Sequence, residues 1–306
     1  MRILVTGATG QIGGALVPRL QGLGTVLAPA EPEFNLANPA ELAARLEQIS
    51  PELIINSAAY TAVDRAEDER DLAFTVNGES PGAIARWAAR RGVPLIQLST
   101  DYIFDGRGER PWREEDPPGP LSVYGESKLA GENAVRAASG AHLIVRTSWV
   151  YSVGGQNFLL TMASLAAQRA ELKVVADQVG APTAAAIVAD GIAQILSRDV
   201  DHIPASFAKA GGIVHLTAGG VTSWHGFASA IVDGLKARNA PVTVERVIAI
   251  RSDEYPAKAR RPHNSRLDLG RLSEVFGITP PQWTTALEIE LDRLVGRQVS
   301  DRQASG

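Results

Sequence analysis

The chain has 306 residues, of which 45% are hydrophobic and 21% are charged, and its formal net charge is -4. This length suggests roughly two domains with sizeable cores, and the negative charge argues against a nucleic-acid-binding protein, which needs a basic surface for phosphates. The sequence contains no cysteine, so disulfides, thiolate metal sites and cysteine nucleophiles are excluded.

The sequence also shows no pattern typical of a membrane-spanning helix or a signal peptide. No apolar run approaches the ~18 residues that a membrane helix needs. The opening MRILVTGATG reaches a turn signal too early for the apolar core of a signal peptide. We therefore expect a soluble, cytoplasmic protein with no membrane partner and no nucleic-acid partner.

Short apolar runs alternate with alanine-rich helical segments over the first 150 residues. Such runs are typical of parallel strands buried between two helix layers, and strands separated by helices imply right-handed crossovers. The pattern predicts an α/β fold with a doubly wound, Rossmann-like parallel sheet. Strands are expected at 2–6, 25–28, 52–59, 94–100 and 142–150, and helices at 11–20, 39–49, 76–92 and 124–138.

After about residue 150 the alternation weakens. A strand at 172–177 and a helix at 183–197 are expected to return to the first sheet. The segments GIVHLT, SWHGFASAIVDGLKARN, VTVERVI and YPAKARRPHNSRL predict a smaller α/β domain. The first domain is thus expected at 1–150 plus about 172–198, and a C-terminal substrate domain at about 151–171 and 199–306.

A glycine-rich loop, GATGQIG, joins the first strand to the first helix and contains Gly7, Gly10 and Gly13. Glycine lets the backbone turn tightly and approach a pyrophosphate, and the helix N-terminus offers free N–H groups to it. The loop therefore predicts a nucleotide cofactor. A tight strand-to-helix turn without a ligand is the alternative.

Two glutamates follow the second strand, where an acidic residue contacts the adenosine ribose in folds of this type. They are Glu31 and Glu33, and no Lys or Arg occurs between Arg19 and Arg45. A 2′-phosphate finds no cation in this stretch, so NADH is favoured over NADPH. A basic residue supplied from elsewhere in the fold would reverse that preference, and an acidic surface turn is the alternative interpretation.

The stretch YGESK places Tyr124 and Lys128 four residues apart, on one face of the expected helix. Hydride transfer to a carbonyl leaves an alkoxide, which Tyr124 can protonate. A nearby ammonium would lower the pKa of the phenol from its usual value of about 10, and Lys128 would also hold the nicotinamide ribose. Thr100, at a strand's carboxyl end, would hydrogen-bond the substrate oxygen. The alternative is a solvated helix face and a structural hydroxyl.

Seven segments together resemble the extended short-chain dehydrogenases, and more narrowly the dTDP-4-dehydrorhamnose reductases. They are GATGQIG, INSAAYTAVDRAE, LSTDYIFDG, VYGESKLAGE, RTSWVY, DQVGAPT and RPHNSRLD, in order from residue 1 to about residue 283. The resemblance implies NAD(P)H-dependent reduction of the C4 ketone of dTDP-4-dehydro-L-rhamnose to dTDP-L-rhamnose. Tyr124 would be the proton donor, Lys128 its modulator and Thr100 the third catalytic residue.

The resemblance also implies which residues bind the cofactor and the nucleotide sugar. The cofactor residues would be Gly7, Gly10, Gln11, Ile12, Gly13, Glu31, Asn35, Leu36, Ala58, Ala59, Tyr60, Thr61, Tyr124 and Lys128. Asn35 stands where the family has an acidic residue. The sugar-nucleotide residues would be Val63, Thr100, Asp101, Tyr124, Trp149, Arg261 and Asn264. Arg261 suits a diphosphate, because a guanidinium binds its oxygens as a fork, and Trp149 packs either on the ligand or in the core.

Some relatives hold a magnesium ion at a dimer contact through glutamates, but this chain has Ala15 and the helix segment TAAAIVAD at the corresponding places. The five histidines show no metal-ligand spacing. We predict no metal site, and the sequence leaves a homodimer open.

Two other functions remain open at this point. A sugar-nucleotide epimerase would share the cofactor loop and the Tyr–Lys pair, but it would retain its cofactor. A third function, that of a dehydratase, is disfavoured. A dehydratase would carry a second carboxylate directly after Asp101, and this chain has Tyr102 there. A non-catalytic, nucleotide-binding regulatory subunit, like that of methionine adenosyltransferase, also resembles this family, although it need not retain Thr100, Tyr124 and Lys128.

Overall fold

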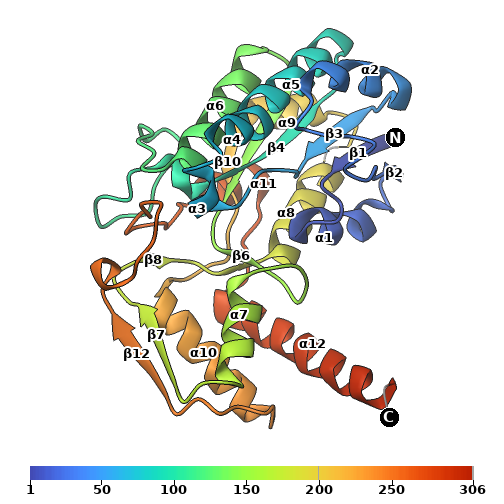
Figure 1. The fold of residues 1–306 in the computed structure, drawn as a ribbon. Coiled ribbons are helices and arrows are strands. Elements are labelled where there is room, and N and C mark those ends of the chain that lie inside the picture. Colours follow the sequence, from blue (N-terminus) through green and yellow to red (C-terminus); the bar gives the residue numbers. More distant parts are fainter. Residues whose placement is uncertain (199, 305–306) are drawn as a thin grey trace.

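The computed structural model describes residues 1–198 and 200–304. Its largest element is a six-stranded sheet with the strand order β10-β5-β4-β3-β1-β2 (Figure 1). All of its pairings are parallel, which confirms the predicted α/β class and its doubly wound parallel sheet. The strands are β1 (Arg2–Thr6), β2 (Thr25–Leu27), β3 (Leu53–Asn56), β4 (Leu95–Thr100), β5 (His142–Thr147) and β10 (Ile213–His215).

Helices cover both faces of this sheet. One face packs against α2 (Pro39–Ile49), α5 (Ser80–Arg91) and α6 (Val123–Ala137), preceded by α3 (Val63–Ala66), α4 (Arg70–Phe74) and the π-helix η1 (Thr75–Glu79). The other packs against α1 (Gln11–Leu20), α8 (Ala185–Arg198), α9 (Ile203–Lys209) and α11 (Gly270–Phe276). Strand β1 shows why consecutive residues of a buried strand are apolar. Ile3 and Val5 enter the core on one face of the sheet, and Leu4 enters the core on the other face.

A second, smaller unit lies below the sheet in Figure 1 and has its own core. Its helices are α7 (Phe158–Ala166), α10 (Trp224–Ala237) and α12 (Trp283–Ala304). Its strands form three pairs: β7 (Glu171–Val175) with β12 (Arg246–Ile250), β8 (Val179–Gly180) with β11 (Thr222–Ser223), and β6 (Val150–Tyr151) with β9 (Thr183–Ala184). Two short 3-10 turns are η2 (Asp101–Ile103) and η3 (Ser252–Glu254).

Two details of the predicted domain limits are wrong. The strand predicted at 172–177 is β7, which pairs with β12 in the small unit and does not return to the first sheet. The GIVHLT segment, assigned to the small domain, contains β10, which pairs with β5 at the edge of the large sheet. The helix predicted at 183–197 does pack in the first unit, as α8 against α1. We keep a two-domain division, with these corrections, as a proposal.

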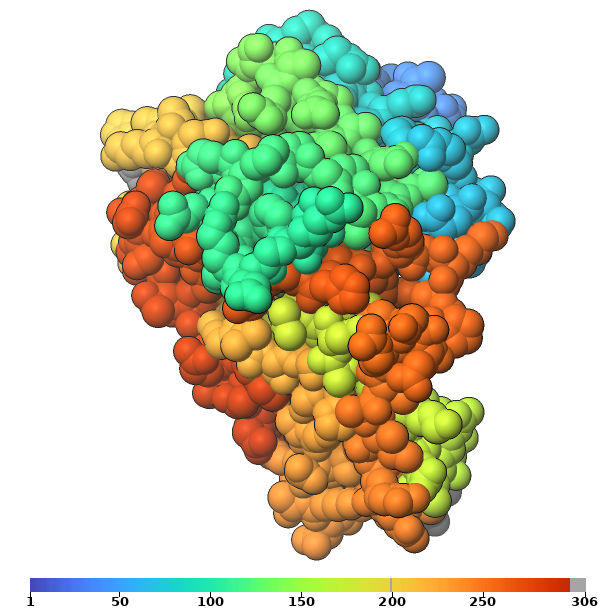
Figure 2. Space-filling model, turned by 90° about the vertical axis from the view of Figure 1, so that its left-hand side faces the viewer, coloured from blue at the N-terminus to red at the C-terminus, as the bar shows by residue number. Residues whose placement is uncertain are grey.

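Segments distant in sequence are joined beside the sheet. The loop that follows η2 lies against the segment that contains Asn264 and Leu267 (Figure 2). Trp112 in this loop forms a β-bridge with Leu267, and its indole N–H donates to the Asn264 carbonyl at 2.9 Å. Among the described residues, no helix has both the length and the apolar character that a bilayer crossing requires.

Candidate active site

A cavity of about 850 Å³ opens at the carboxyl ends of β1, β3 and β4. The chain order of the sheet reverses between β1 and β3, and ligands of open parallel sheets bind at such a point. The structure brings eighteen of the predicted site residues to this one cavity: Gly7, Gly10, Gln11, Ile12, Gly13, Glu31, Asn35, Leu36, Ala58, Ala59, Tyr60, Thr61, Val63, Thr100, Asp101, Tyr124, Lys128 and Trp149.

The glycine loop forms one wall of the cavity. Gly7 has a φ of +66°, which disfavours other residues, and a Cβ there would lie 2.8 Å from the Ala58 backbone. A Cβ on Gly13 would lie 2.2 Å from the Gly7 carbonyl oxygen. Helix α1 then begins after Gly10 without a side-chain cap, so its first N–H groups face the cavity edge with no side-chain acceptor. This arrangement suits a pyrophosphate.

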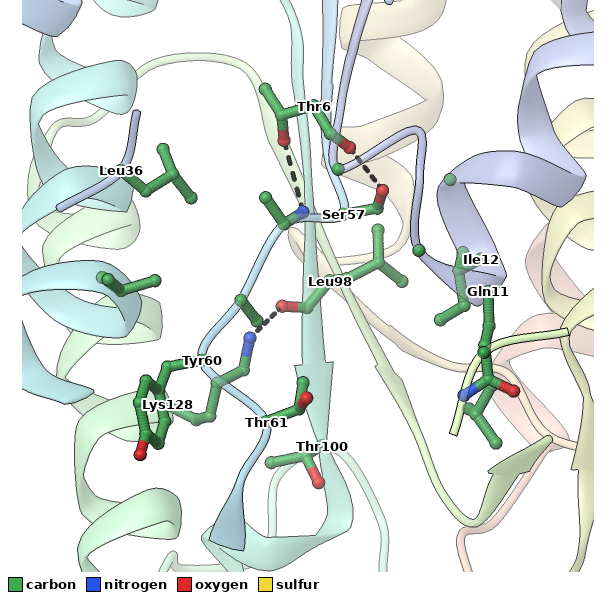
Figure 3. A pocket seen from close by; sticks show the side chains of 18 of the residues that line it. Thr6, Gln11, Ile12, Leu36, Ser57, Tyr60, Thr61, Leu98, Thr100 and Lys128 are labelled. Atoms are coloured by element: carbon green, nitrogen blue, oxygen red, sulfur yellow. Dashed lines mark hydrogen bonds between the residues drawn. The ribbon is translucent and has the colours of Figure 1, made fainter. Parts of the chain in front are cut away.

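The opposite wall is formed by the segment after β2, which contains Leu36, and the segment after β3, which contains Tyr60. Figure 3 shows these two residues across the cavity from Gln11 and Ile12. Asn77 in η1 holds this wall: its Oδ1 accepts the Tyr60 N–H at 2.9 Å, and its Nδ2 donates to the Tyr60 carbonyl at 2.9 Å and to Ser127 Oγ at 3.0 Å. Sequence reasoning missed Asn77, although an asparagine inside a helical run is a signal of a side chain bonded to backbone.

The catalytic candidates converge from β4 and α6. Ser122 caps α6 by accepting the Gly125 N–H on its hydroxyl at 3.3 Å, and the helix then carries Tyr124 and Lys128 on one face. The side chains of Tyr124 and Thr100 line the same cavity, and the Thr100 hydroxyl acts to lower the pKa of the Tyr124 phenol. The Lys128 Nζ donates to the Leu98 carbonyl at 2.7 Å (Figure 3). The tyrosine, threonine and lysine therefore meet at one place, as the sequence predicted.

The pKa of Tyr124 is raised in the structure, whereas the sequence predicted that Lys128 would lower it. Burial raises the pKa of Tyr124 to about 12, and the hydrogen bond to Thr100 opposes that rise. The expected lowering by Lys128 is not found: besides burial, the groups that shift the pKa of Tyr124 are Thr100 and Asp101. Burial lowers the pKa of Lys128 to about 8, against the opposing charge of Glu132. At neutral pH the phenol is therefore protonated, which is the form that a proton donor needs.

Asp101 brings a carboxyl group next to this pair. Its side chain is 2% exposed, its Oδ1 accepts the Thr100 hydroxyl at 3.1 Å, and its Oδ2 makes no hydrogen bond within the described residues. Burial raises the pKa of Asp101 to about 6, opposed by hydrogen bonds with Ser265 and Thr100. An unsatisfied carboxylate oxygen beside the hydroxyl of Thr100 is a suitable acceptor for a ligand hydroxyl.

Two predicted sugar-nucleotide residues are not brought into the cavity lining. Arg261 donates from Nη2 to Asp64 Oδ2 at 2.7 Å, and its Nη1 is buried without a partner among the described residues. Asn264 donates to the carbonyls of Gly108 and Arg110 at 3.2 Å and 2.8 Å. The Asn264 amide therefore holds the neighbouring loop, whereas Arg261 retains a free donor.

Several lining residues were missed by sequence reasoning. Tyr102 packs edge-on against Tyr124, with ring centroids 5.4 Å apart, and the Arg261 guanidinium opposes the rise in pKa that burial causes at its phenol. Others come from the ends of β3, β4 and β5 and from the loop after β6: Ser57, Leu98, Ser99, Thr147, Ser148, Gly155, Gln156 and Asn157. The rule that identified Thr100, a polar residue at the carboxyl end of a parallel strand, also applies to Thr147 and Ser148.

Comparison with known proteins agrees with this geometry. The family model described as the RmlD substrate binding domain matches residues 1–295. The chain is 46% identical over 289 residues to the dTDP-4-dehydrorhamnose reductase of Burkholderia thailandensis. The aligned region covers 94% of this chain and 97% of that protein.

Two solved structures are similar over nearly the whole chain. The dTDP-4-dehydrorhamnose reductase of Clostridium acetobutylicum is 34% identical, with a TM-score of 0.86 and coverage of 96% and 99% of the two chains. That of Bacillus anthracis, solved in complex with NADP, is 32% identical, with a TM-score of 0.85 and coverage of 95% and 99%. The chain therefore belongs to the RmlD substrate binding domain family, the family of the dTDP-4-dehydrorhamnose reductases.

Proposed function

We propose that the protein reduces the C4 ketone of dTDP-4-dehydro-L-rhamnose to dTDP-L-rhamnose with a nicotinamide cofactor. The observation that carries this proposal is that Tyr124 and Thr100 line the same cavity as the glycine loop. A protonated phenol beside a dinucleotide-type loop is the arrangement that carbonyl reduction requires, since the reaction needs a hydride and a proton at adjacent atoms.

The backbone of the glycine loop, which lines the cavity, fits the pyrophosphate of a dinucleotide cofactor. The positions of Gly7 and Gly13 leave no room for a Cβ, so the loop can approach a pyrophosphate closely. The reduced nicotinamide, when bound, supplies the hydride to C4. Lys128 is held by Leu98 at one of its donors, and an ammonium has three. Its remaining donors are free to hold the nicotinamide ribose.

The protein's own groups handle the proton. Tyr124 donates its phenolic proton to the oxygen that becomes the C4 hydroxyl, and Thr100, which lines the cavity with Tyr124, orients that oxygen through its own hydroxyl. Asp101 accepts from the sugar through its unpaired Oδ2. Arg261, next to Tyr102 at the edge of the site, offers its free Nη1 to the diphosphate.

We propose NADH as the preferred cofactor. Glu31 lines the cavity near the end of β2, and Lys128, in the catalytic part, is the single basic residue of the lining within the part of the chain that the structure describes. A carboxylate accepts hydrogen bonds from a ribose diol but repels a 2′-phosphate. The absence of basic residues between Arg19 and Arg45 supports the same preference.

The test is to generate dTDP-4-dehydrorhamnose in situ and to follow the loss of absorbance of NADH and of NADPH. Wild type should consume reduced cofactor stoichiometrically, and Tyr124→Phe should be slower by about 10²-fold or more. Tyr255→Phe, at a tyrosine that is 51% exposed, is the matched control and should retain wild-type activity. Epimerised product with no net loss of NADH would establish an epimerase instead. Nucleotide binding without any turnover would indicate a regulatory subunit.

We also propose that catalysis and any homodimer are independent of a bridging metal, because Ala15 supplies no carboxylate at the expected contact. Treatment with EDTA should change neither the rate nor the sedimentation coefficient. A loss of either that magnesium restores would contradict this proposal.

A further inference from the structure

Trp149 has an unusual backbone at the wall of the cavity. It follows β5, lines the cavity and is 9% exposed. Its φ of +50° lies in the left-handed region, which is rare for a bulky residue and persists only where surrounding contacts hold it. The contacts that hold Trp149 therefore decide where its indole stands in the cavity.

The first of these contacts is a stack with Trp224, the first residue of α10 in the small unit. The two ring centroids are 3.7 Å apart, and the planes differ by 12°. Trp224 does not line the cavity. It is itself held by Phe158, with centroids 4.6 Å apart, and through that contact it belongs to the core of the small unit. A residue of the small unit thus supports a residue of the cavity wall.

The second contact is the backbone of Gly180 in β8. A Cβ at Gly180 would lie 2.7 Å from Cε2 and 3.0 Å from Cζ2 of Trp149, so the indole occupies the space that any other side chain would need. Strand β8 pairs with β11, with Gly180 opposite Thr222. Because β11 leads directly into Trp224, this pairing sets the position of Gly180 relative to Trp224.

We propose that Trp224 and Gly180 are positioning residues that hold the Trp149 indole where the sugar nucleotide binds. The inference rests on the proposed function, in which Trp149 contacts the nucleotide sugar. Neither residue touches the substrate. They act by removing the freedom of Trp149 to leave its left-handed conformation. Neither of these two contacts of Trp149 involves a residue of the cofactor loop.

The experiment uses four variants of the full chain. Trp224→Leu removes the stack, Trp224→Phe retains an aromatic face, and Gly180→Ala displaces the indole without changing Trp224. The matched control is Trp283→Leu, because Trp283 packs in the same core, 6.1 Å from the Phe227 ring. For each protein, calorimetry measures the affinity for dTDP-L-rhamnose and for NADH, and steady-state assays give KM and kcat.

Trp224→Leu and Gly180→Ala should each weaken dTDP-L-rhamnose binding and raise the sugar-nucleotide KM by roughly fivefold to tenfold, the range that one aromatic pair supports. NADH affinity should be unchanged in both, Trp224→Phe should restore most of the loss, and Trp283→Leu should bind as wild type. Wild-type dTDP-L-rhamnose affinity in both Trp224→Leu and Gly180→Ala would overturn the inference, as would an equal loss in Trp283→Leu. If wild type itself fails to bind dTDP-L-rhamnose, the proposed function is wrong and this inference falls with it.

Discussion

Glu132 and Arg146 form a buried bidentate ion pair, and Glu132 lies on the same helix as Lys128. Arg146 Nε donates to Glu132 Oε1 at 2.9 Å and Nη2 donates to Oε2 at 2.7 Å, with the side chains 1% and 4% exposed. Ser99, next to Thr100 on β4, also donates to Oε1 at 2.5 Å. Glu132 lies one helical turn after Lys128, so its bonds to Ser99 and Arg146 connect α6 to β4 and β5.

Glu132→Gln should lower the free energy of unfolding by about 3–5 kcal/mol, because it leaves a buried guanidinium without its counter-charge. Urea denaturation measures this change. The double variant Glu132→Met with Arg146→Met removes both charges and should lose less stability than Glu132→Gln alone. Equal losses in the single and double variants would show that packing, and not the unpaired charge, is responsible.

The pH dependence of the reaction should report Lys128. Its pKa is lowered to about 8 by burial, so the ammonium is present below that pH and is lost above it. The pH profile of kcat/KM, which titrates the free enzyme, should fall as the pH rises through about 8. Glu132 raises the pKa of Lys128, so Glu132→Gln should move the fall to lower pH. A profile that stays at the same pH in this variant would exclude the coupling.

Asp101 should reduce stability at neutral pH. Its pKa of about 6 in the folded chain exceeds its ordinary value of 3.8, so the folded state binds more protons than the unfolded state between these values. Stability therefore falls as the pH rises from about 4 to about 6. Asp101→Asn should raise the free energy of unfolding above pH 6 by roughly 1–3 kcal/mol, and the gain should vanish below pH 4.

Chemical denaturation at pH 4 and at pH 7.5 measures the difference, and the exposed Asp253→Asn provides the control. A gain of the same size at both pH values would contradict the assignment of a raised pKa to Asp101. The same variant should bind the nucleotide sugar less tightly, since the amide nitrogen that replaces one carboxylate oxygen no longer accepts hydrogen bonds from it.

Much of the first 150 residues could be predicted from local sequence because β1, β3 and β4 are almost wholly buried and helices follow them in the chain. The motif residues share one cavity for a similar reason: the glycine loop, Thr100 and Tyr124 lie at or near element boundaries that the sequence marks. The pairing of β7 with β12 was not predictable, since the partners are 75 positions apart and no periodicity encodes a partner. Trp224 stacks on Trp149 from the small unit, so only a tertiary contact identifies it.

Cofactor preference should depend on Glu31 and not on Glu33. Both are exposed, but Glu31 alone of the two lines the cavity. A charge-assisted hydrogen bond to the ribose contributes about 1.5–3 kcal/mol, so Glu31→Ala should lower kcat/KM for NADH by at least about tenfold. The rate with NADPH should fall less or rise, because a repelling charge is removed.

Glu33→Ala is the matched control and should leave the NADH to NADPH ratio of kcat/KM at the wild-type value. A shift of the same size in both variants would mean that net charge near the cavity, and not a contact at the ribose, sets the preference. An unchanged ratio in Glu31→Ala would place the ribose elsewhere.

The glycine loop should tolerate no side chain at Gly13. A Cβ there meets the Gly7 carbonyl carbon at 2.7 Å and Ser57 Oγ at 2.8 Å, in addition to the Gly7 oxygen. Two of these atoms are backbone and cannot rotate away, so the loop must move from the path that holds the pyrophosphate. Gly13→Ala should therefore abolish measurable NADH binding in fluorescence titration and cost about 1–3 kcal/mol of stability. Gly22→Ala, where a Cβ meets nothing within 4 Å, should bind NADH normally, and full NADH affinity in Gly13→Ala would show that the cofactor does not use this loop.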